Sequence, residues 1–435
     1  MSNLLKYADE MWLSGSKGRH PWRSLNTLEK ITDGLWFASS FANMTLIDGG
    51  SELLVIDPGA TNNEEKKFHQ IRHQFPNIPV KGIVITHGHH DHCFGVERYI
   101  DESKDKGWPS PEIFAHKAID QRFERYNKTA GFNTIINSRQ FRGGENVGSW
   151  EKDYIFPTQH ISEPTSISVG RMQLDLYPDR GETDDAIWIH IPDLEAICTG
   201  DLFVWTVPNA GNPQKVQRYA GDWAQALLKM NDLQSSFLLP GHGPPIIGKV
   251  RVKDALESTA EYLMSLEEQT LNLMNNGASL DEILLKAKPP QKLSAKHFLR
   301  PVYDEPEFII RNIWRLYGGW YDGQPSNLKP PAEASIAKEI SSLIPGGTDK
   351  LTQRSLELAG QGEWRLACKL VDMAYQSDSS NLEIKTARGQ IYAQRAKHET
   401  STMSIGIFNS TAREMGIKPD SNNTFSVQEN KHKNS

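Results

Sequence analysis

Histidine and aspartate side chains gather directly after an apolar run at residues 80–85. The stretch reads Thr86-His87-Gly88-His89-His90-Asp91-His92. The apolar run has the composition and length of a buried β-strand. His87 and His89 can face one point, and Asp91 and His92 can face a second point nearby. Neutral imidazole nitrogens and carboxylate oxygens are ligands for zinc, iron or manganese. We therefore predict a metal site at the end of this strand.

This stretch resembles the His-x-His-x-Asp-His signature that follows a strand ending in Thr in the metallo-β-lactamase superfamily. The resemblance implies an α/β fold, an αββα sandwich, with metal ions at one edge of its two sheets and hydrolytic chemistry. It also implies that Asp57 braces the metal loop from behind. The sequence alone equally allows Asp57 to be an ordinary residue of the turn Asp57-Pro58-Gly59. Cys93, beside the loop, is interpreted as a packing residue.

The rest of the metal site has to come from distant strand ends, since a catalytic zinc keeps about three protein ligands plus water. His242 stands in Pro-Gly-His-Gly, where glycines on both sides let the backbone approach closely. Asp201 ends the run Thr-Gly-Asp at another predicted strand end. We expect His242 to bind a second metal and Asp201 to bridge the two.

The last ligand departs from the superfamily's usual pattern, a His in a Pro-Gly-His-Thr turn ahead of the bridging Asp. Here the turn is Arg-Gly-Glu-Thr, so Glu182 stands in the His position. His160 is the rival, but it falls before a strand rather than in the turn after it. We favour Glu182. One divalent ion, most readily zinc, is then expected on His87, His89 and Glu182, and another on Asp91, His92 and His242, with Asp201 shared.

Glu in this turn is similar to the alkylsulfatase branch of the superfamily. Residues 299–306 and 311–323 also resemble the helical alkylsulfatase dimerisation domain, through the run Arg-Asn-x-Trp-x-x-Tyr-Gly-Gly-Trp-Tyr. This likeness implies a homodimer. In the sulfate pocket that it implies, Asn209 fits the Asn position, whereas the Arg position reads Gln214 or Lys215. Asp201 stands where alkylsulfatases usually carry Glu.

The elements that must position these residues follow from the hydrophobic pattern. Strands are predicted at residues 35–38, 44–47, 53–56, 80–85, 112–116, 167–169, 172–177, 186–191, 196–201 and 236–242. A Gly-Gly pair at 49–50 predicts a hairpin. Residues 61–76 are predicted to form a helix, and a second helix is predicted to begin at residues 94–100. Residues 101–111 are predicted to form a loop. His116, at a strand end, is interpreted as structural.

The segment at residues 120–150 is polar and irregular, and it could cover the active site. Its Arg139 and Arg142 could grip an anionic substrate; equally, they could be ordinary surface charges. After residue 248 the chain becomes helical, with helices expected at 252–273 and 306–320 and three or four more at 332–396. The predicted parts are an N-terminal extension (1–30), a catalytic domain (31–248), a helical dimerisation domain (249–398) and a disordered tail (399–435).

Composition excludes several classes of protein. The 435 residues are 23% charged and 38% hydrophobic, values typical of a globular protein. The net charge of −6 does not indicate a basic surface for binding nucleic acid. The 3 cysteines are too few for a disulfide framework, so a reducing compartment is predicted. No run approaches the roughly 20 apolar residues that span a bilayer, and the N-terminus lacks the pattern of a signal peptide. We therefore expect a cytoplasmic protein.

These features together predict a homodimeric hydrolase with two metal ions that acts on a small-molecule sulfate ester, such as an alkyl sulfate, or a similar anionic ester. Asp91 is the expected catalytic residue, which orients the attacking hydroxide or carries its proton, and Asn209 is expected to bind the substrate. A carboxylic-ester, thioester or lactone hydrolase on the same scaffold is the alternative. A third possibility is a non-catalytic metal-binding or helical-repeat interaction protein.

Overall fold

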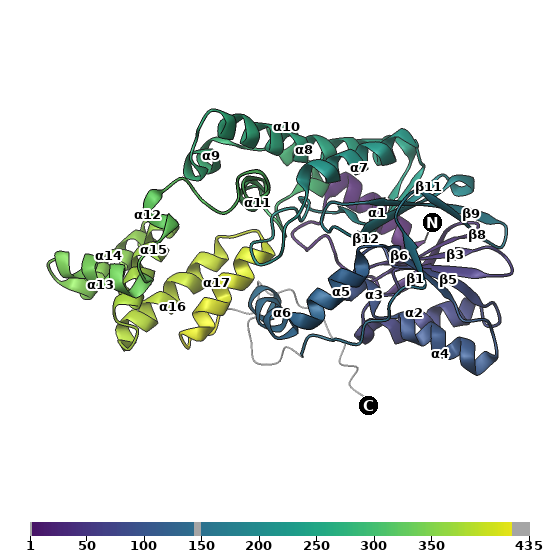
Figure 1. Cartoon of the computed structure of the whole chain (residues 1–435), viewed down its shortest axis with the longest axis horizontal. Coiled ribbons are helices and arrows are strands. Elements are labelled where there is room, and N and C mark those ends of the chain that lie inside the picture. Colours follow the sequence, from purple (N-terminus) through teal and green to yellow (C-terminus); the bar gives the residue numbers. More distant parts are fainter. Residues whose placement is uncertain (1, 143–148, 420–435) are drawn as a thin grey trace. The chain divides into compact units, whose positions relative to one another are not determined.

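The computed structural model describes residues 2–142 and 149–419 of the chain (Figure 1). Residue contacts divide the chain into two compact units. The first consists of Met1–Ala130 and Glu151–Trp320, and the second of Gly131–Trp150 and Tyr321–Ser435. All the predicted metal ligands lie in the first unit.

The first unit contains a 7-stranded sheet in which the strands follow one another in chain order. The strands are β1 (Thr27–Thr32), β2 (Leu35–Ser39), β3 (Met44–Asp48), β4 (Leu53–Ile56), β5 (Val80–Val84), β6 (Glu112–His116) and β7 (Gln159–Ile161). Strands β1 to β4 are antiparallel, which confirms the hairpin at Gly49-Gly50, and β4 to β7 are parallel. Parallel pairing brings the ends of β4, β5 and β6 to one edge of the sheet.

A second, 6-stranded sheet has the order β13-β12-β11-β10-β9-β8. Its strands are β8 (Thr165–Val169), β9 (Met172–Asp179), β10 (Ala186–Ile191), β11 (Ala196–Val204), β12 (Phe237–His242) and β13 (Ile246–Ile247). Strands β11 and β12 are parallel, with Cys198 opposite Leu239, and helix α7 (Ala220–Asp232) connects them. Asp201, in the C-terminal half of β11, and His242, the last residue of β12, therefore lie toward the same edge of this sheet.

The two sheets share one hydrophobic core. Phe37 and Leu54 of the first sheet and Leu174 and Ile189 of the second belong to a single cluster, and all four are fully buried. Each such side chain contributes about 1.5–3 kcal/mol when it is removed from water. Helices cover the outer faces (Figure 1). Helices α2 (Thr61–Gln74) and α4 (Val96–Lys106) pack against the first sheet, and α7 and α8 (Lys249–Asn275) pack against the second. This arrangement confirms the predicted αββα sandwich.

Two of the segments between strands contain more helix than the sequence predicted. Helix α4 (Val96–Lys106) extends into the predicted loop at 101–111, because its charged residues face outward while Val96, Tyr99 and Ser103 are buried. The irregular segment at 120–150 contains α5 (Ile119–Lys128), α6 (Ala130–Asn137) and a π-helical turn (Ser138–Arg142). Amphipathic spacing of Ile119, Phe123 and Tyr126, all buried, explains α5.

The remaining helices of the first unit include the long α8 and the predicted apolar helix α11. Their bounds are α1 (Asn3–Ser14), α3 (His90–Cys93), α8 (Lys249–Asn275), α9 (Leu280–Lys286), α10 (Gln291–Ser294) and α11 (Pro306–Gly318), with 3-10 turns at Pro192–Leu194 and His297–Leu299. The compact unit therefore extends to residue 320, beyond the point at which strands give way to helices. The proposed domain boundary at 248 coincides with that change of secondary structure, and as the end of a catalytic domain it stays a prediction.

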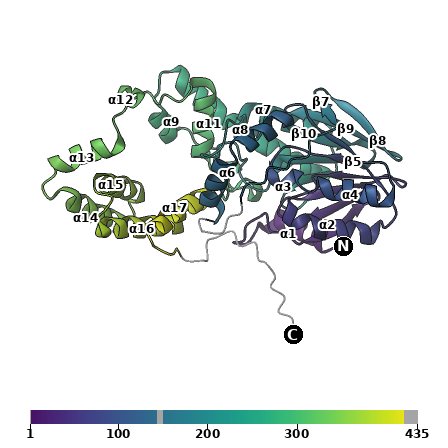
Figure 2. The same ribbon diagram turned by 60° about the horizontal axis from the view of Figure 1, so that its bottom comes forward.

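Between residues 321 and 419, all the regular elements of the second unit are helices (Figure 2). They are α12 (Pro325–Leu328), α13 (Glu333–Leu343), α14 (Gly347–Gly360), α15 (Trp364–Ser377), α16 (Leu382–Lys397) and α17 (Thr402–Glu414). The predicted disorder from residue 399 is wrong for α17, where Met403 and Ala412 are buried. The remainder of the predicted tail, residues 420–435, lies outside the described residues. Within the described ranges, the structure contains no helix long and apolar enough to cross a membrane.

Candidate metal centre

Parallel strand ends bring the predicted ligands to one place, and glycines allow the close approach. Strand β5 ends at Val84, and the metal loop follows it directly. Asp201 lies in β11 and His242 ends β12. A Cβ atom on Gly241 would lie 2.1 Å from Oδ1 of Asp201. Only glycine at this position leaves room for the Asp201 carboxylate beside His242.

The first group of ligand atoms joins the metal loop to the turn before β10. Nε2 of His87 lies 2.7 Å from Nδ1 of His89. Nδ1 of His89 is 3.7 Å from Oε1 of Glu182, and Nε2 of His87 is 3.7 Å from Oδ2 of Asp201. Glu182, and not His160, therefore lies among the loop histidines. His160 is partly exposed and its Nε2 lies 2.9 Å from Oδ2 of Asp120.

The second group surrounds His92 and His242. Nε2 of His92 lies 3.5 Å from Oδ1 of Asp201 and 3.8 Å from Oδ2 of Asp91. Nε2 of His242 lies 3.3 Å from Oδ2 of Asp201 and 3.5 Å from Oδ2 of Asp91. Asp201 thus has one oxygen facing His92 and the other facing His242 and His87, as a shared carboxylate requires.

The buried atoms of this cluster fit a divalent cation. Three sets each have ligand atoms within 4.8 Å of one another: His87, His92 and Asp201; Asp91, His92 and His242; and His89, Glu182 and Asp201. Among the described residues, Nε2 of His92 and Oδ1 of Asp201 are buried without a hydrogen-bond partner. Buried polar atoms are normally paired. A metal ion between the imidazoles and carboxylates would satisfy both atoms.

Asp57 fixes the orientation of the metal loop from behind. Its Oδ1 accepts a hydrogen bond from the Thr86 amide at 2.8 Å, and its Oδ2 accepts one from the Thr86 hydroxyl at 2.7 Å. Oδ2 also lies 2.8 Å from Nδ1 of His92. A proton held on Nδ1 leaves Nε2 free to bind a metal. In the same way, Nδ1 of His242 donates a hydrogen bond to the Phe41 carbonyl at 2.6 Å, which leaves Nε2 of His242 free to bind a metal.

The electrostatic field of the cluster predicts how metal affinity depends on pH. Burial alone would lower the pKa of His92, but the carboxylates of Asp201, Asp57 and Asp91 outweigh it and raise the pKa to about 10. In the metal-free fold, this raised pKa stabilises the structure fully below the ordinary value of 6.5, and the stabilisation is lost as the pH rises through about 10. A metal must displace this proton to reach Nε2.

Zinc affinity is therefore expected to rise by at least about tenfold per pH unit between about pH 6.5 and 9, with release of at least about one proton on binding. The lower bound applies because, at His242 also, the carboxylates of Asp201 and Asp91 outweigh burial and raise the pKa. Competition titrations with a zinc chelator across this range measure the slope, and calorimetry in two buffers of different ionisation enthalpy counts the proton. An affinity that is flat across the range would contradict this account of His92.

Sequence reasoning missed a buried cation beside Glu182. The Arg218 guanidinium contacts Oε1 of Glu182 and donates to the Asn209 carbonyl at 2.7 Å. The side-chain nitrogen Nδ2 of Asn209 also donates a hydrogen bond to Oε1 of Glu182. Burial raises the pKa of the Glu182 carboxyl, and Arg218 opposes the rise. The sequence places the cation at Gln214 or Lys215. Lys215 does lie within electrostatic range of Glu182 and Asp91, but Arg218 of the same irregular loop makes the direct contact with Glu182, and no periodic pattern in the sequence marks it.

A second missed pair supports the metal loop from α5. The Gly88 amide donates to Oδ2 of Asp185 at 2.9 Å, and Nε of Arg122 lies 2.7 Å from Oδ1 of Asp185. Both side chains are buried. Since Gly88 separates His87 from His89, this buried pair fixes the backbone between two predicted ligands. Asp185 follows the turn that carries Glu182, so it links that turn to the loop.

Other residues singled out from the sequence lie elsewhere. His116 accepts a hydrogen bond from the Ala118 amide at 3.0 Å, a structural role. Cys93 is buried, and burial raises the pKa of its thiol. Arg139 belongs to the second unit, and the Arg142 side chain lies outside the described residues. The prediction that these arginines reach a substrate therefore stays a prediction.

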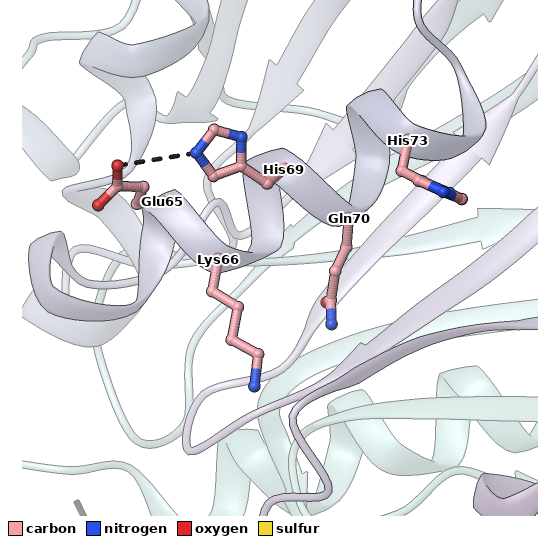
Figure 3. Close-up of a pocket in the computed structure, with 5 residues that line it drawn as sticks. All are labelled: Glu65, Lys66, His69, Gln70 and His73. Carbon is pink, nitrogen blue, oxygen red and sulfur yellow. Dashed lines mark ion pairs between the residues drawn. The ribbon is translucent and has the colours of Figure 1, made fainter. Parts of the chain in front are cut away.

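A hollow along helix α2 does not contain any predicted site residue. It is lined by Glu65, Lys66, His69, Gln70 and His73, all from one helix (Figure 3). Nε2 of His69 lies 3.7 Å from Oε1 of Glu65, with 64% and 76% of the two side chains exposed. Exposed pairs of this kind contribute little and mark no site by themselves.

Comparisons with known proteins find matches to both halves of the chain. Residues 39–242 match the family model of the metallo-beta-lactamase superfamily, and residues 279–416 match the model described as alkyl sulfatase dimerisation. The chain is 24% identical to a linear primary-alkylsulfatase of Pseudomonas sp. over 351 residues, which cover 77% of this chain and 66% of the relative. It is also 24% identical to the alkyl/aryl-sulfatase BDS1 of Saccharomyces cerevisiae, with 82% and 59% covered.

Among solved structures, the stereoselective inverting sec-alkylsulfatase Pisa1 from Pseudomonas sp. superposes with a TM-score of 0.81 at 22% identity. The superposition covers 90% of this chain and 66% of that protein. It shows that the two share a fold. The chain spans less than two thirds of the length of these relatives, between 59% and 66%.

Proposed function

We propose that this chain, which belongs to the metallo-β-lactamase superfamily and carries an alkylsulfatase dimerisation segment, is a metal-dependent hydrolase of sulfate esters. One observation carries the proposal: a buried cluster of imidazole and carboxylate ligand atoms lies next to the donors of Asn209 and Arg218. The cluster suits divalent cations, and the donors suit an anion. The alkylsulfatase names of the relatives favour a sulfate ester over other anionic esters.

We assign the ligands to two ions, most readily zinc. His87, His89 and Glu182 would hold one, Asp91, His92 and His242 the other, and Asp201 would contact both. When bound, the ions would lower the pKa of a water molecule toward neutrality and stabilise negative charge on the leaving oxygen. Of the carboxylates in the set, Asp91 is the most exposed, at 27%, against 9% for Asp201 and 5% for Glu182.

The chain's own side chains would then share the remaining tasks. Asp91 is exposed enough to accept a proton from an attacking water and to orient it. Nε of Arg218, which is buried without a hydrogen-bond partner among the described residues, and the second hydrogen of the Asn209 side-chain nitrogen would donate hydrogen bonds to the sulfate oxygens that do not react. Thr86 and Asp57 keep His92 in one orientation and one tautomer. The Arg218 fork suits a tetrahedral anion with several acceptor oxygens.

We further propose that the protein is a homodimer. The support is the match of residues 279–416 to a dimerisation model, together with apolar side chains that remain exposed near the end of α11, such as Tyr317 at 55% and Trp320 at 69%. A mass of one chain in light scattering would overturn this proposal. The predicted cytoplasmic location stays a prediction.

The test of the proposed function combines elemental analysis with a sulfate-release assay on a medium-chain alkyl sulfate. We expect about two zinc ions per chain and release of inorganic sulfate, because a catalytic zinc needs about three protein ligands and the cluster supplies enough for two. Removal of the metal by a chelator is expected to lower the rate by at least about a thousandfold, and added zinc should restore it.

Acyl esters, thioesters and lactones of matched chain length serve as the control substrates. Turnover of these compounds without release of sulfate would replace the proposed substrate class but keep the metal-dependent hydrolase. Protein that contains no metal, and sulfate release that survives the chelator, would each contradict the assignment of the ligand cluster.

A further inference from the structure

The loop at residues 205–219, between β11 and α7, carries both Asn209 and Arg218 but forms neither helix nor strand. Holding such a segment in one conformation costs about 1–2 kcal/mol of backbone entropy per residue. Precise placement of the two donors therefore requires contacts from outside the loop. The structure provides these contacts from residues 304–312, which are far away in the sequence.

Asp304 holds the backbone of the loop next to Asn209. Its Oδ2 accepts a hydrogen bond from the Gly211 amide at 2.6 Å, and its Oδ1 accepts one from the Glu305 amide at 2.7 Å. The Asp304 side chain is fully buried. Burial raises the pKa of Asp304 to about 7, and above that pH the hydrogen bonds from amides to the ionised carboxylate are stronger than those between neutral groups. The carboxylate thus ties the loop to the start of α11.

Asn312, nearly two turns into α11, holds the loop at two further points. Its side-chain nitrogen donates to the Ala210 carbonyl at 2.6 Å and to the Arg218 carbonyl at 3.2 Å. Its Oδ1 accepts a hydrogen bond from Nη2 of Arg315 at 2.7 Å, which fixes the orientation of the amide. One buried side chain therefore joins the two ends of the segment between Asn209 and Arg218.

Gly211 packs directly against the first turn of α11. A Cβ atom at this position would lie 2.2 Å from the Ile309 amide nitrogen and 2.2 Å from the Phe308 carbonyl carbon. Both neighbours are backbone atoms of a helix, so neither can move aside easily. The contact therefore fixes how closely the backbone of the loop packs against the helix.

We propose that Asp304 and Asn312 are positioning residues that hold Asn209 and Arg218 in the geometry needed to bind the anionic group of the substrate. The inference rests on the proposed function for the identity of that anion. It also gives a second role to the segment that matches the dimerisation model, because both residues lie within it. Residues 304–312 would shape the anion pocket of their own chain.

The principal variant is Asn312→Asp, which keeps the size of the side chain but places a carboxylate oxygen against two carbonyl oxygens. The matched control is Asn272→Asp, the same change at an exposed position of α8. We expect hydrogen exchange of the amides at 209–218 to accelerate by about tenfold in Asn312→Asp. With zinc at saturation, the inhibition constant of inorganic sulfate and the KM of the alkyl sulfate should each rise by about tenfold, more than kcat falls.

Gly211→Ala provides a second route to the same displacement, should Asn312→Asp fail to fold. Its control is Gly360→Ala, a helical position where the added Cβ meets nothing within 4 Å. We expect Gly211→Ala to reproduce the faster exchange and the weaker sulfate binding, and the control to reproduce neither.

The outcomes separate this inference from the proposed function. Exchange and sulfate affinity that match the unaltered protein in both variants would overturn the inference, whatever substrate is hydrolysed. A loosened loop with unchanged KM and sulfate inhibition would also overturn it, since the role would then be structural only. Faster hydrogen exchange in both variants, combined with no sulfate release by the unaltered protein, would show that residues 304–312 hold the loop in place. It would also reject a sulfate ester as the substrate.

Discussion

Asp201→Asn is expected to lower the rate of hydrolysis by at least about a thousandfold and to reduce the metal content below two ions per chain. The carboxylate faces His242 at 3.3 Å, His92 at 3.5 Å and His87 at 3.7 Å, so it serves both groups of ligands. Asparagine has one acceptor oxygen and one NH2 group, which cannot bind a cation. Elemental analysis and the initial rate are the measurements.

The matched control for Asp201→Asn is Asp101→Asn on α4, where the carboxylate is 58% exposed and pairs with Lys104 on the surface. This variant should keep its metal and its rate, because exposed ion pairs contribute little. If Asp201→Asn retains both ions and the full rate, Asp201 does not bridge the two ligand groups.

Asp57→Asn is expected to weaken zinc binding by about 10–100-fold while the fold survives. The change keeps the size and shape of the side chain. One oxygen can still accept from the Thr86 amide, but the new NH2 group then faces Nδ1 of His92. A donor in this place favours the tautomer that carries its proton on Nε2, the atom that has to bind the metal. Zinc competition titration measures the loss.

The backbone of Asp57 makes this variant well suited to the test. Asp57 has a φ of 55°, in the left-handed region, which asparagine tolerates better than most residues do. The substitution therefore adds no backbone strain, but the metal-free protein is expected to melt at a lower temperature, because the Asp57 carboxylate contributes to the raised pKa of His92. Asp101→Asn again serves as the control. Zinc affinity equal to that of the unaltered protein would show that Asp57 does not set the tautomer of His92.

The parts of this protein that the sequence predicted are those with a short-range signal. Residues 80–85 form a continuous apolar run before a cluster of ligands, and the structure has β5 and the metal loop there. The turn around Glu182 could be placed because Arg-Gly-Glu-Thr resembles the superfamily's Gly-His-Thr turn that precedes the bridging Asp. The helical second half followed from apolar residues at helical spacing, as in α8.

The parts that could not be predicted depend on contacts between distant segments. Arg218 looks like any surface arginine until the loop folds back onto Glu182. Arg122 lies on an amphipathic helix whose register only the packing against Asp185 reveals. Helix α17 has a sequence rich in Ser and Thr, and it is held by burial of Met403 and Ala412 more than by helix propensity. Local composition favours disorder there, and tertiary packing overrides it.

The loop at 205–219 has a consequence for engineering and for divergence within the family. Gly211 packs against the start of α11, and the carbonyls of Ala210 and Arg218 accept hydrogen bonds from Asn312. The loop and residues 304–312 therefore form one module that can be exchanged only as a whole. A chimera that receives the loop alone from a relative would inherit donors without their support. A graft of both segments together carries the complete pocket, so changes in the two segments should be inherited in pairs.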